Sequence, residues 1–306
     1  MIDITLENFQ TELIDGSMAT PVLLDIWAEW CGPCKQLGPV LEKLEAEYAG
    51  RFTLAKLDAD KVPQISQQLS QMFGVRSIPF CVMFKGGQPV DGFVGAIPAD
   101  EIRTFLDKHV PDAAEIEAAT QEDAAQEALA EGDTEGALEK LQHAIATDPA
   151  NDDVRFDYVK LLLQEGRTDD AKVAFAPVIA KTALVRRFDA LQRWMAAIDF
   201  AAPPAGGLRT VADFDARIAA NKRDFEARFG RAQLLMAEQR WTEAMDELLD
   251  ILMRDKAWND ELARKTCVAI LALIEPPKVK VADGQIPPED PTVATYRRRL
   301  SSVILS

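Results

Sequence analysis

Residues 22–35 read VLLDIWAEWCGPCK, and this stretch decides the fold of the first part of the chain. It opens with a short, mostly apolar run of the kind that forms a strand buried on both faces. After the two cysteines, apolar side chains recur at helical spacing, at Leu37, Val40, Leu41, Leu44 and Tyr48. Cys31 and Cys34 are therefore predicted to lie where a buried strand turns into a helix.

The surrounding segments alternate between strand-like and helix-like patterns. Strands are expected at residues 52–57, 80–84 and 90–94, with a turn over residues 85–88. Helices are expected at residues 62–73 and 99–109, and Pro39 should kink the helix that follows the cysteines. This alternation predicts an α/β domain over residues 1–110.

The spacing of the two cysteines suits thiol–disulfide exchange. That reaction needs one accessible thiolate and a second thiol close enough to resolve the mixed disulfide. Two intervening residues at a helix start bring both sulfurs within bonding reach. Cys31 would also lie beside free backbone N–H groups and the positive helix end, which lowers the pKa of its thiol. Cys31 is the predicted nucleophile and Cys34 the more buried resolving thiol.

Asp25 interrupts the apolar strand that precedes the cysteines. A buried carboxylate is unfavourable unless it has a role. Desolvation should raise the pKa of Asp25 and let it exchange a proton with Cys34 while the mixed disulfide resolves. The alternative is a carboxylate that is satisfied by hydrogen bonds and has no catalytic role.

The remaining cysteines and the histidines indicate no metal or cofactor. Cys81 and Cys267 each stand singly in an apolar stretch, which favours buried, inert thiols, although Cys81 is near enough to Pro79 to leave an auxiliary redox role open. No second cysteine pair exists, and His109 and His143 lie far from the cysteine pair in sequence, which disfavours zinc.

Charge and hydropathy narrow the class of partner and the compartment. The net charge of -16 argues against nucleic acid binding, which needs clustered Lys and Arg. Residues 111–150 hold 11 acidic side chains and one Lys, which favours a solvated acidic linker and first helix over a docking surface for a basic partner. No signal peptide and no membrane-spanning run is evident, so a cytoplasmic protein without a membrane partner is expected.

Residues 111–306 are predicted to form an all-α domain with an internal repeat of 34 residues. The repeat aligns Gly132 with Gly166, which are predicted to make the turn within each helix pair, and Ala137 with Ala171. A third, offset copy contains Ala232, Ala244, Leu248 and Ile251. The period and the small residues resemble the tetratricopeptide repeat. The match is partial, because the early aromatic residue of each repeat is missing and Pro177 interrupts the second repeat.

An amphipathic helix is expected over residues 292–305, after a breaker at 203–207 and a loop at 276–290. Its apolar side would hold Val293, Tyr296, Leu300, Val303 and Ile304, beside the run Arg297-Arg298-Arg299. Such a helix either docks on the repeats as a cap or binds a partner protein, and the sequence leaves both readings open.

The first 110 residues resemble thioredoxin. The resemblance rests on the WCGPCK string, on the Asp in the preceding strand, on Ile78-Pro79 before the fourth strand and on Gly95-Ala96 after the last. It implies a central mixed sheet flanked by helices, a Lys56–Asp25 pair and a cis peptide bond before Pro79. It also implies a shallow apolar substrate groove framed by Trp30, Gly32, Pro33, Ile78, Pro79, Gly95 and Ala96.

The order of the two domains resembles the bacterial chaperedoxins, which combine a thioredoxin fold with holdase activity and pass clients to the chaperonin. The resemblance implies client proteins, a cellular dithiol reductant and a chaperonin that docks on residues 292–305. The chain retains both active-site cysteines, which favours an active dithiol oxidoreductase. Two alternatives stay open: a dedicated disulfide reductase whose repeats dock one substrate, and an interaction scaffold with an incidental redox site.

Overall fold

The computed structural model describes residues 1–203, 209–276 and 289–305. The chain divides into two compact units, Met1–Ala119 and Thr120–Ser306, and each is described by itself. The predicted breaker at 203–207 and loop at 276–290 fall largely on residues 204–208 and 277–288, outside the described residues. Within the described parts of the chain, no helix is long and apolar enough to cross a membrane.

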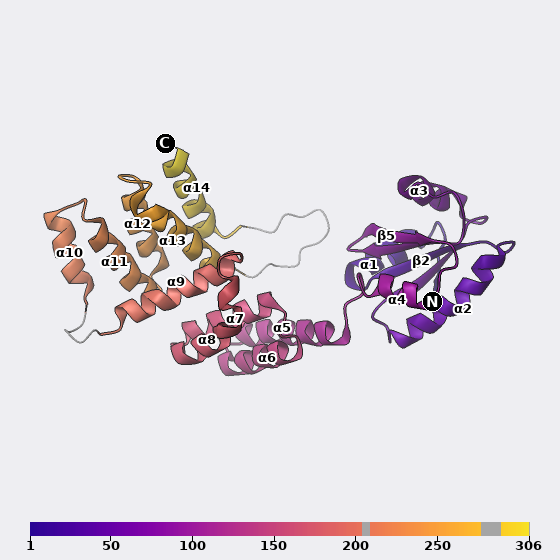
Figure 1. Cartoon of the computed structure of the whole chain (residues 1–306), viewed down its shortest axis with the longest axis horizontal. Helices are drawn as coiled ribbons and strands as arrows, with labels where there is room; N and C mark the ends of the chain where they lie inside the picture. Colours follow the sequence, from indigo (N-terminus) through magenta and orange to yellow (C-terminus); the bar gives the residue numbers. More distant parts are fainter. Residues whose placement is uncertain (204–208, 277–288, 306) are drawn as a thin grey trace. The chain divides into compact units, whose positions relative to one another are not determined.

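The first unit is built on a five-stranded mixed sheet in the order β1-β3-β2-β4-β5 (Figure 1). The strands are β1 Ile2–Asp3, β2 Val22–Trp27, β3 Thr53–Asp58, β4 Phe80–Lys85 and β5 Gln88–Val94. β1, β3 and β2 run parallel, whereas β4 pairs antiparallel with both β2 and β5. Gly86 and Gly87 form the β4–β5 turn at positive φ, which glycine adopts without strain. The predicted α/β fold with a mixed central sheet is confirmed.

Helices cover both faces of this sheet (Figure 1). They are η1 Phe9–Asp15, α1 Gly16–Ala19, α2 Gly32–Glu47, α3 Pro63–Phe73 and α4 Ala99–Leu106. α2 and α4 pack on the face that holds Leu23 and Leu54, whereas η1 and α3 pack on the face that holds Leu24 and Ile26. The elements β1, η1 and α1 were not predicted, because each is too short to show a periodic apolar pattern.

Strand register places the buried carboxylate in the middle of the α2 face. Asp25 lies beside Lys56 on β3 and beside Cys81 on β4. Since side chains alternate between the faces of a strand, all three lie on the same face as Leu23 and Leu54, under α2.

The second unit is helical. Its elements, of which α5 starts before residue 120, are α5 Ala113–Ala130, α6 Thr134–Thr147, α7 Asp152–Gln164, α8 Thr168–Phe175, η2 Ala176–Lys181, α9 Arg186–Ala201, α10 Val211–Ala220, α11 Phe225–Ala237, α12 Trp241–Leu252, α13 Trp258–Ile274 and α14 Pro291–Leu305. Gly132 and Gly166 make the α5–α6 and α7–α8 turns at positive φ, and Gln239 takes the corresponding conformation before α12. α8 ends just before Pro177, where the chain continues as the 3-10 turn η2. The predicted helical repeats are confirmed.

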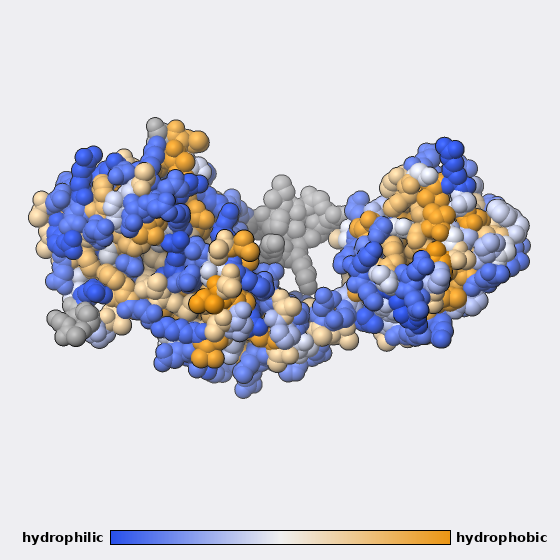
Figure 2. All heavy atoms as spheres, in the orientation of Figure 1, coloured by the Kyte–Doolittle hydropathy of each residue, from blue (hydrophilic) through white to orange (hydrophobic). Residues whose placement is uncertain are grey.

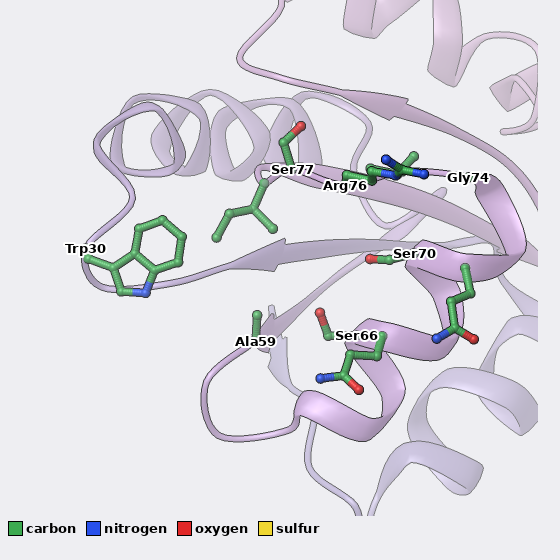
Figure 3. Close-up of a pocket in the computed structure, with 11 residues that line it drawn as sticks. Trp30, Ala59, Ser66, Ser70, Gly74, Arg76 and Ser77 are labelled. Atoms are coloured by element: carbon green, nitrogen blue, oxygen red, sulfur yellow. The ribbon is translucent and has the colours of Figure 1, made fainter.

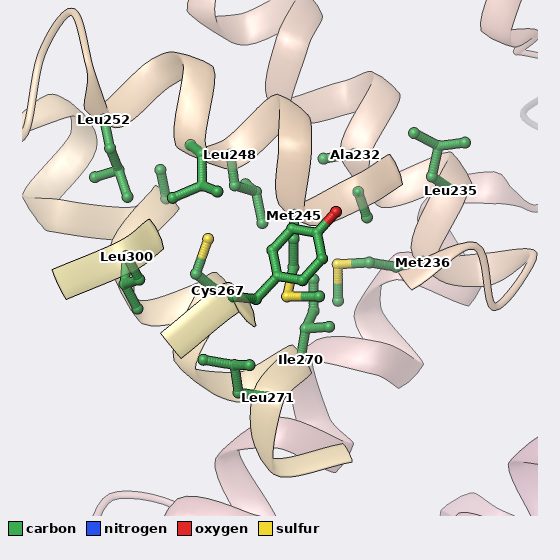
Figure 4. Close-up of a cluster of buried hydrophobic side chains, with 14 of the residues drawn as sticks. Ala232, Leu235, Met236, Met245, Leu248, Leu252, Cys267, Ile270, Leu271 and Leu300 are labelled. Carbon is green, nitrogen blue, oxygen red and sulfur yellow. The ribbon is translucent and has the colours of Figure 1, made fainter. Parts of the chain in front are cut away.

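Helix α14 docks on α12 and α13 within its own unit, so of the two readings that the sequence left open the structure has the cap. Tyr296 and Leu300 are buried in the same cluster as Cys267, and Figure 4 shows Leu300 near Cys267 and Leu271. The Tyr296 hydroxyl also donates to Asp246 Oδ1 at 3.0 Å. The last repeat would otherwise expose its apolar face, and α14 covers it. Val303 is half-buried, and Ile304 is exposed at the end of the helix.

Candidate redox site

The two cysteines of the site lie at the start of α2, as predicted. Cys31 is the N-cap residue in an extended conformation, and its Sγ accepts a hydrogen bond from the Cys34 backbone N–H at 3.2 Å. Pro33, near the helix start, has no N–H that would need a partner there. Cys31 and Cys34 form a disulfide with their Cα atoms 5.3 Å apart. The strand-to-helix turn therefore holds two sulfurs that can form and break a bond.

The two cysteines, of which Cys34 was expected to be the more buried, are almost equally buried when they are joined. In the disulfide state Cys31 is 4% exposed and Cys34 is 3% exposed. Ala28, together with the half-buried Trp27 and Ile78, packs around both sulfurs. What distinguishes Cys34 is a cavity of about 200 Å³, which it lines and Cys31 does not.

That cavity joins Cys34 to the buried carboxylate. Asp25 and Lys56 line it together with Cys34, and Trp27, Lys35, Gly38 and Pro39 complete its wall. A cavity of this size is roomy enough for water, and the charged side chains of Asp25, Lys35 and Lys56 in its wall supply polar partners. Asp25 and Cys34 are therefore joined by a space through which a proton can pass.

The environment of Asp25 raises its pKa from 3.8 to about 6. Desolvation is the main cause, since the residue is only 1% exposed. The positive charge of Lys56 and a hydrogen bond from the Cys81 thiol act in the opposite direction, and the negative charge of Glu42 adds to the rise. Asp25 thus changes its charge close to neutral pH.

Lys56 does not form the direct ion pair with Asp25 that the resemblance implied. Among the described residues its ion pair is with Glu42 of α2. Glu42 is more accessible than the fully buried Asp25, so the lysine head group keeps contact with solvent while it pairs. Lys56 acts on Asp25 through attraction between the charges and not through a short contact.

Asp25→Asn is expected to stabilise the first unit at neutral and alkaline pH. Between about pH 4 and pH 6 the folded state still holds a proton on Asp25 that the unfolded chain has released, so the free energy of unfolding falls as the pH rises. Above pH 6 the buried carboxylate is charged, and its burial lowers the free energy of unfolding by roughly 3 kcal/mol for a shift of about two pKa units. The variant should therefore gain about 2–3 kcal/mol at pH 8 and little at pH 4.

Chemical denaturation at both pH values measures this gain. The matched control is Asp3→Asn, which removes an exposed carboxylate from the same sheet. Equal stability of Asp25→Asn and the parent chain at pH 8 would contradict the burial argument.

A groove lies beside the cysteines on the side of α3. It has a volume of about 580 Å³ and is lined by Trp30, Ala59, Ser66, Gln67, Ser70, Gln71, Gly74, Val75, Arg76, Ser77 and Ile78. Figure 3 shows Trp30 at one end, with Ser66 and Ser70 projecting from α3. The Trp30 side chain is 71% exposed, and its Nε1–H donates to Asp60 Oδ2 at 2.9 Å. The structure thus brings two predicted residues, Trp30 and Ile78, onto one concave surface.

The other predicted groove residues do not line this concave surface. Gly32 and Pro33 are exposed at the tip of α2. The Ile78–Pro79 bond is cis, as the resemblance implied, and the Pro79 carbonyl accepts from the Gly95 N–H at 2.8 Å. Ala96 is exposed beside Gly95.

The serine and glutamine side chains of α3 were missed by the sequence reasoning. Ser66, Gln67, Ser70 and Gln71 make the groove more polar than the apolar surface expected there. The available signal was the row of Ser and Gln residues on one side of the amphipathic segment 63–73, which also fits an ordinary solvated helix face.

The two free cysteines are buried. Burial raises the pKa of the Cys267 thiol to about 12, and burial together with the nearby Asp25 raises the pKa of the Cys81 thiol well above its ordinary value. Among the described residues no group of three or more His, Cys, Asp or Glu side chains is arranged to hold a metal ion.

Comparisons with known proteins match both units. The family model described as Thioredoxin matches residues 1–108, and two models described as Tetratricopeptide repeat match residues 128–195 and 205–304. The thioredoxin of Chlorobaculum thiosulfatiphilum is 47% identical over 104 residues, which cover 34% of this chain and 91% of that protein. Thioredoxin 1 of Nostoc sp. is 40% identical over 107 residues, 35% of this chain and 94% of its own length. Thioredoxin C-2 of Corynebacterium nephridii is 39% identical over 110 residues, 36% of this chain and 96% of its own length.

Proposed function

This chain belongs to the thioredoxin family and is a thioredoxin-type disulfide reductase with tetratricopeptide repeats, and we propose that it reduces the disulfides of unfolding client proteins that its helical unit holds. The Cys31–Cys34 disulfide at the start of α2, with Asp25 behind it, supports the redox half of this proposal. An exposed apolar segment of the helical unit supports the holding half.

The proposed reaction begins from the reduced dithiol. The Cys31 thiolate attacks one sulfur of a client disulfide, the client S–S bond breaks, and the other client sulfur leaves as a thiolate that takes up a proton. Cys34 then loses its proton to Asp25 through the shared cavity and attacks the Cys31 sulfur. The client leaves as a dithiol and the Cys31–Cys34 disulfide remains. A cellular dithiol reductant supplies the two electrons that regenerate the enzyme.

The substrate strand is proposed to bind next to Cys31. Trp30 and Ile78 offer apolar contact there, and the exposed Gly32 and Pro33 leave room for an approaching chain. The polar side chains of α3 extend this surface and supply hydrogen-bonding groups. Pro79, Gly95 and Ala96 are proposed to frame the other side.

Three large aliphatic side chains are exposed within residues 173–184 of the helical unit. Val173 of α8 is 74% exposed, Ile179 of η2 is 55% exposed and Leu184 is 88% exposed. Figure 2 shows hydrophobic side chains at the surface over α8 and the segment that follows it. We call these three side chains the 173–184 surface. These three exposed side chains are close together in the sequence, and we propose that they form a contact site for the apolar segments that unfolding proteins expose.

Replacing Val173, Ile179 and Leu184 together by Ser is expected to remove most of the ability to suppress aggregation of a cysteine-free client. Full burial of each side chain contributes roughly 1.5–3 kcal/mol, so even partial contact predicts client binding weakened on the order of a hundredfold. The Cys31→Ser, Cys34→Ser double variant should suppress aggregation as well as the parent chain. Light scattering of a heated client measures both.

The matched control replaces the exposed Met72 and Met253 by Ser, which removes apolar surface elsewhere on the chain. If the parent chain does not suppress aggregation at all, the holding half of the proposal fails. The dedicated reductase, whose repeats dock one substrate, then takes its place.

We also propose that held clients pass to the chaperonin, by resemblance to the bacterial chaperedoxins. Tyr296 and Leu300 do not mediate that contact while α14 is docked, because both are buried. Ile304 and Leu305, which are exposed at the end of α14, stay available for it.

A further inference from the structure

Cys81 is the β4 residue paired with Asp25, and its side chain carries a polar hydrogen. The antiparallel pairing of β2 and β4 places the two residues directly opposite each other. The Cys81 Sγ lies 3.7 Å from Asp25 Oδ1, within hydrogen-bonding reach of a thiol. Cys81 is 0% exposed and Asp25 is 1% exposed, so this contact is shielded from bulk solvent.

We propose that Cys81 is a positioning residue for Asp25: its thiol donates a hydrogen bond to Oδ1 and holds the carboxylate in its charged form, facing the cavity shared with Cys34. The proposal deepens the redox half of the proposed function, on which it rests. It also gives Cys81 a role other than the auxiliary redox role that the sequence left open.

The charged and titratable groups near Asp25 come from β3, α2 and β4. The charges of Lys56 on β3 and Glu42 on α2 act on the carboxylate, and Lys35 and Cys34 of α2 line the same cavity. Lys56 is engaged by Glu42, so its charge attracts Asp25 from a distance. The short-range contact to the carboxylate comes from Cys81.

The Cys81 thiol is suited to donating and unsuited to attacking a disulfide. Burial and the adjacent carboxylate keep its pKa far above neutral, so the sulfur retains its proton. A thiolate is the reactive form in exchange, and this thiol is neither ionised nor accessible. Its proton is therefore available to Asp25 throughout the working pH range.

The test is a direct titration of the Asp25 carboxyl carbon by NMR in the full-length, oxidised chain, with Asp25→Asn used to assign the signal. Cys81→Ala and Cys81→Val both lack the donor, and Val also fills the space, so a packing defect in one variant does not decide the result. Both should raise the midpoint by about half a pH unit, because a thiol is a weak donor and its hydrogen bond stabilises the charged carboxylate less than an ordinary N–H or O–H donor does. Cys81→Ser restores a donor and should return the midpoint to the parent value or below it.

An unchanged midpoint in both donorless variants, or a Ser variant that shifts as they do, would overturn the assignment. The pH profile of disulfide reduction separates this result from the proposed function. If the Asp25 titration midpoint moves but the pH profile of disulfide reduction does not, Cys81 still positions Asp25. The proposed proton transfer from Cys34 to Asp25 is then wrong.

Discussion

Replacing Cys31 by Ser is expected to reduce the rate of insulin disulfide reduction to that of the uncatalysed reaction with the same reductant. Cys31 is the N-cap residue of α2, where the helix start stabilises a thiolate. A serine hydroxyl at this position has the same geometry but does not ionise near neutral pH and forms no mixed disulfide. Of the three remaining cysteines, Cys34 lines the cavity that it shares with Asp25, and Cys81 and Cys267 are buried, so none of them is expected to replace Cys31 as the attacking thiol.

The control for this prediction is Cys267→Ser, which removes a thiol of the helical unit. Its turnover should equal that of the parent chain. Insulin reduction that survives in Cys31→Ser at a substantial fraction of the parent rate would contradict the assignment of the nucleophile.

Deleting residues 291–306 is expected to destabilise the helical unit by on the order of 5 kcal/mol. The deletion removes Val293, Tyr296 and Leu300 from the core, and burial of each contributes roughly 1.5–3 kcal/mol. It also exposes the apolar face of α12 and α13 that α14 covers. Denaturant unfolding followed by circular dichroism measures the loss, and insulin reduction should stay unchanged because Cys31 lies in the other unit.

A point variant makes the same test without shortening the chain. Leu300→Ala should cost about 2–4 kcal/mol, since it leaves a cavity in a packed cluster. Leu305→Ala is the matched control, because that side chain is 86% exposed and its loss should change stability by less than about 0.5 kcal/mol. Equal stability of the two variants would show that α14 is not packed as the structure has it.

Local sequence signals were sufficient to predict those structural features that depend on residues close together in the chain. The CGPC string at the end of an apolar strand predicted the start of α2. Gly132 and Gly166 predicted two turns between paired helices. In each case the residue itself must adopt a particular backbone conformation, either at a helix start or at a positive φ angle.

Features that depend on contacts between distant residues were not predictable. The contact between Asp25 and Cys81 arises from the β2–β4 register, which no local pattern specifies. Lys56 was expected to pair with Asp25. It pairs with Glu42 instead, and this depends on how α2 lies over the sheet. An amphipathic helix such as α14 looks the same in sequence whether its own domain or a partner covers it, so the docked position of Tyr296 came only from the structure.

The most direct test of the account is to trap a client on the Cys34→Ser variant and identify the cysteine that carries it. The reduced variant is mixed with a disulfide-containing client under unfolding conditions, and the adduct is digested and mapped by mass spectrometry. Cys34 is the resolving thiol, so its loss should leave one client joined to each chain through Cys31. An adduct on Cys81 or Cys267, or no adduct at all, would contradict the account.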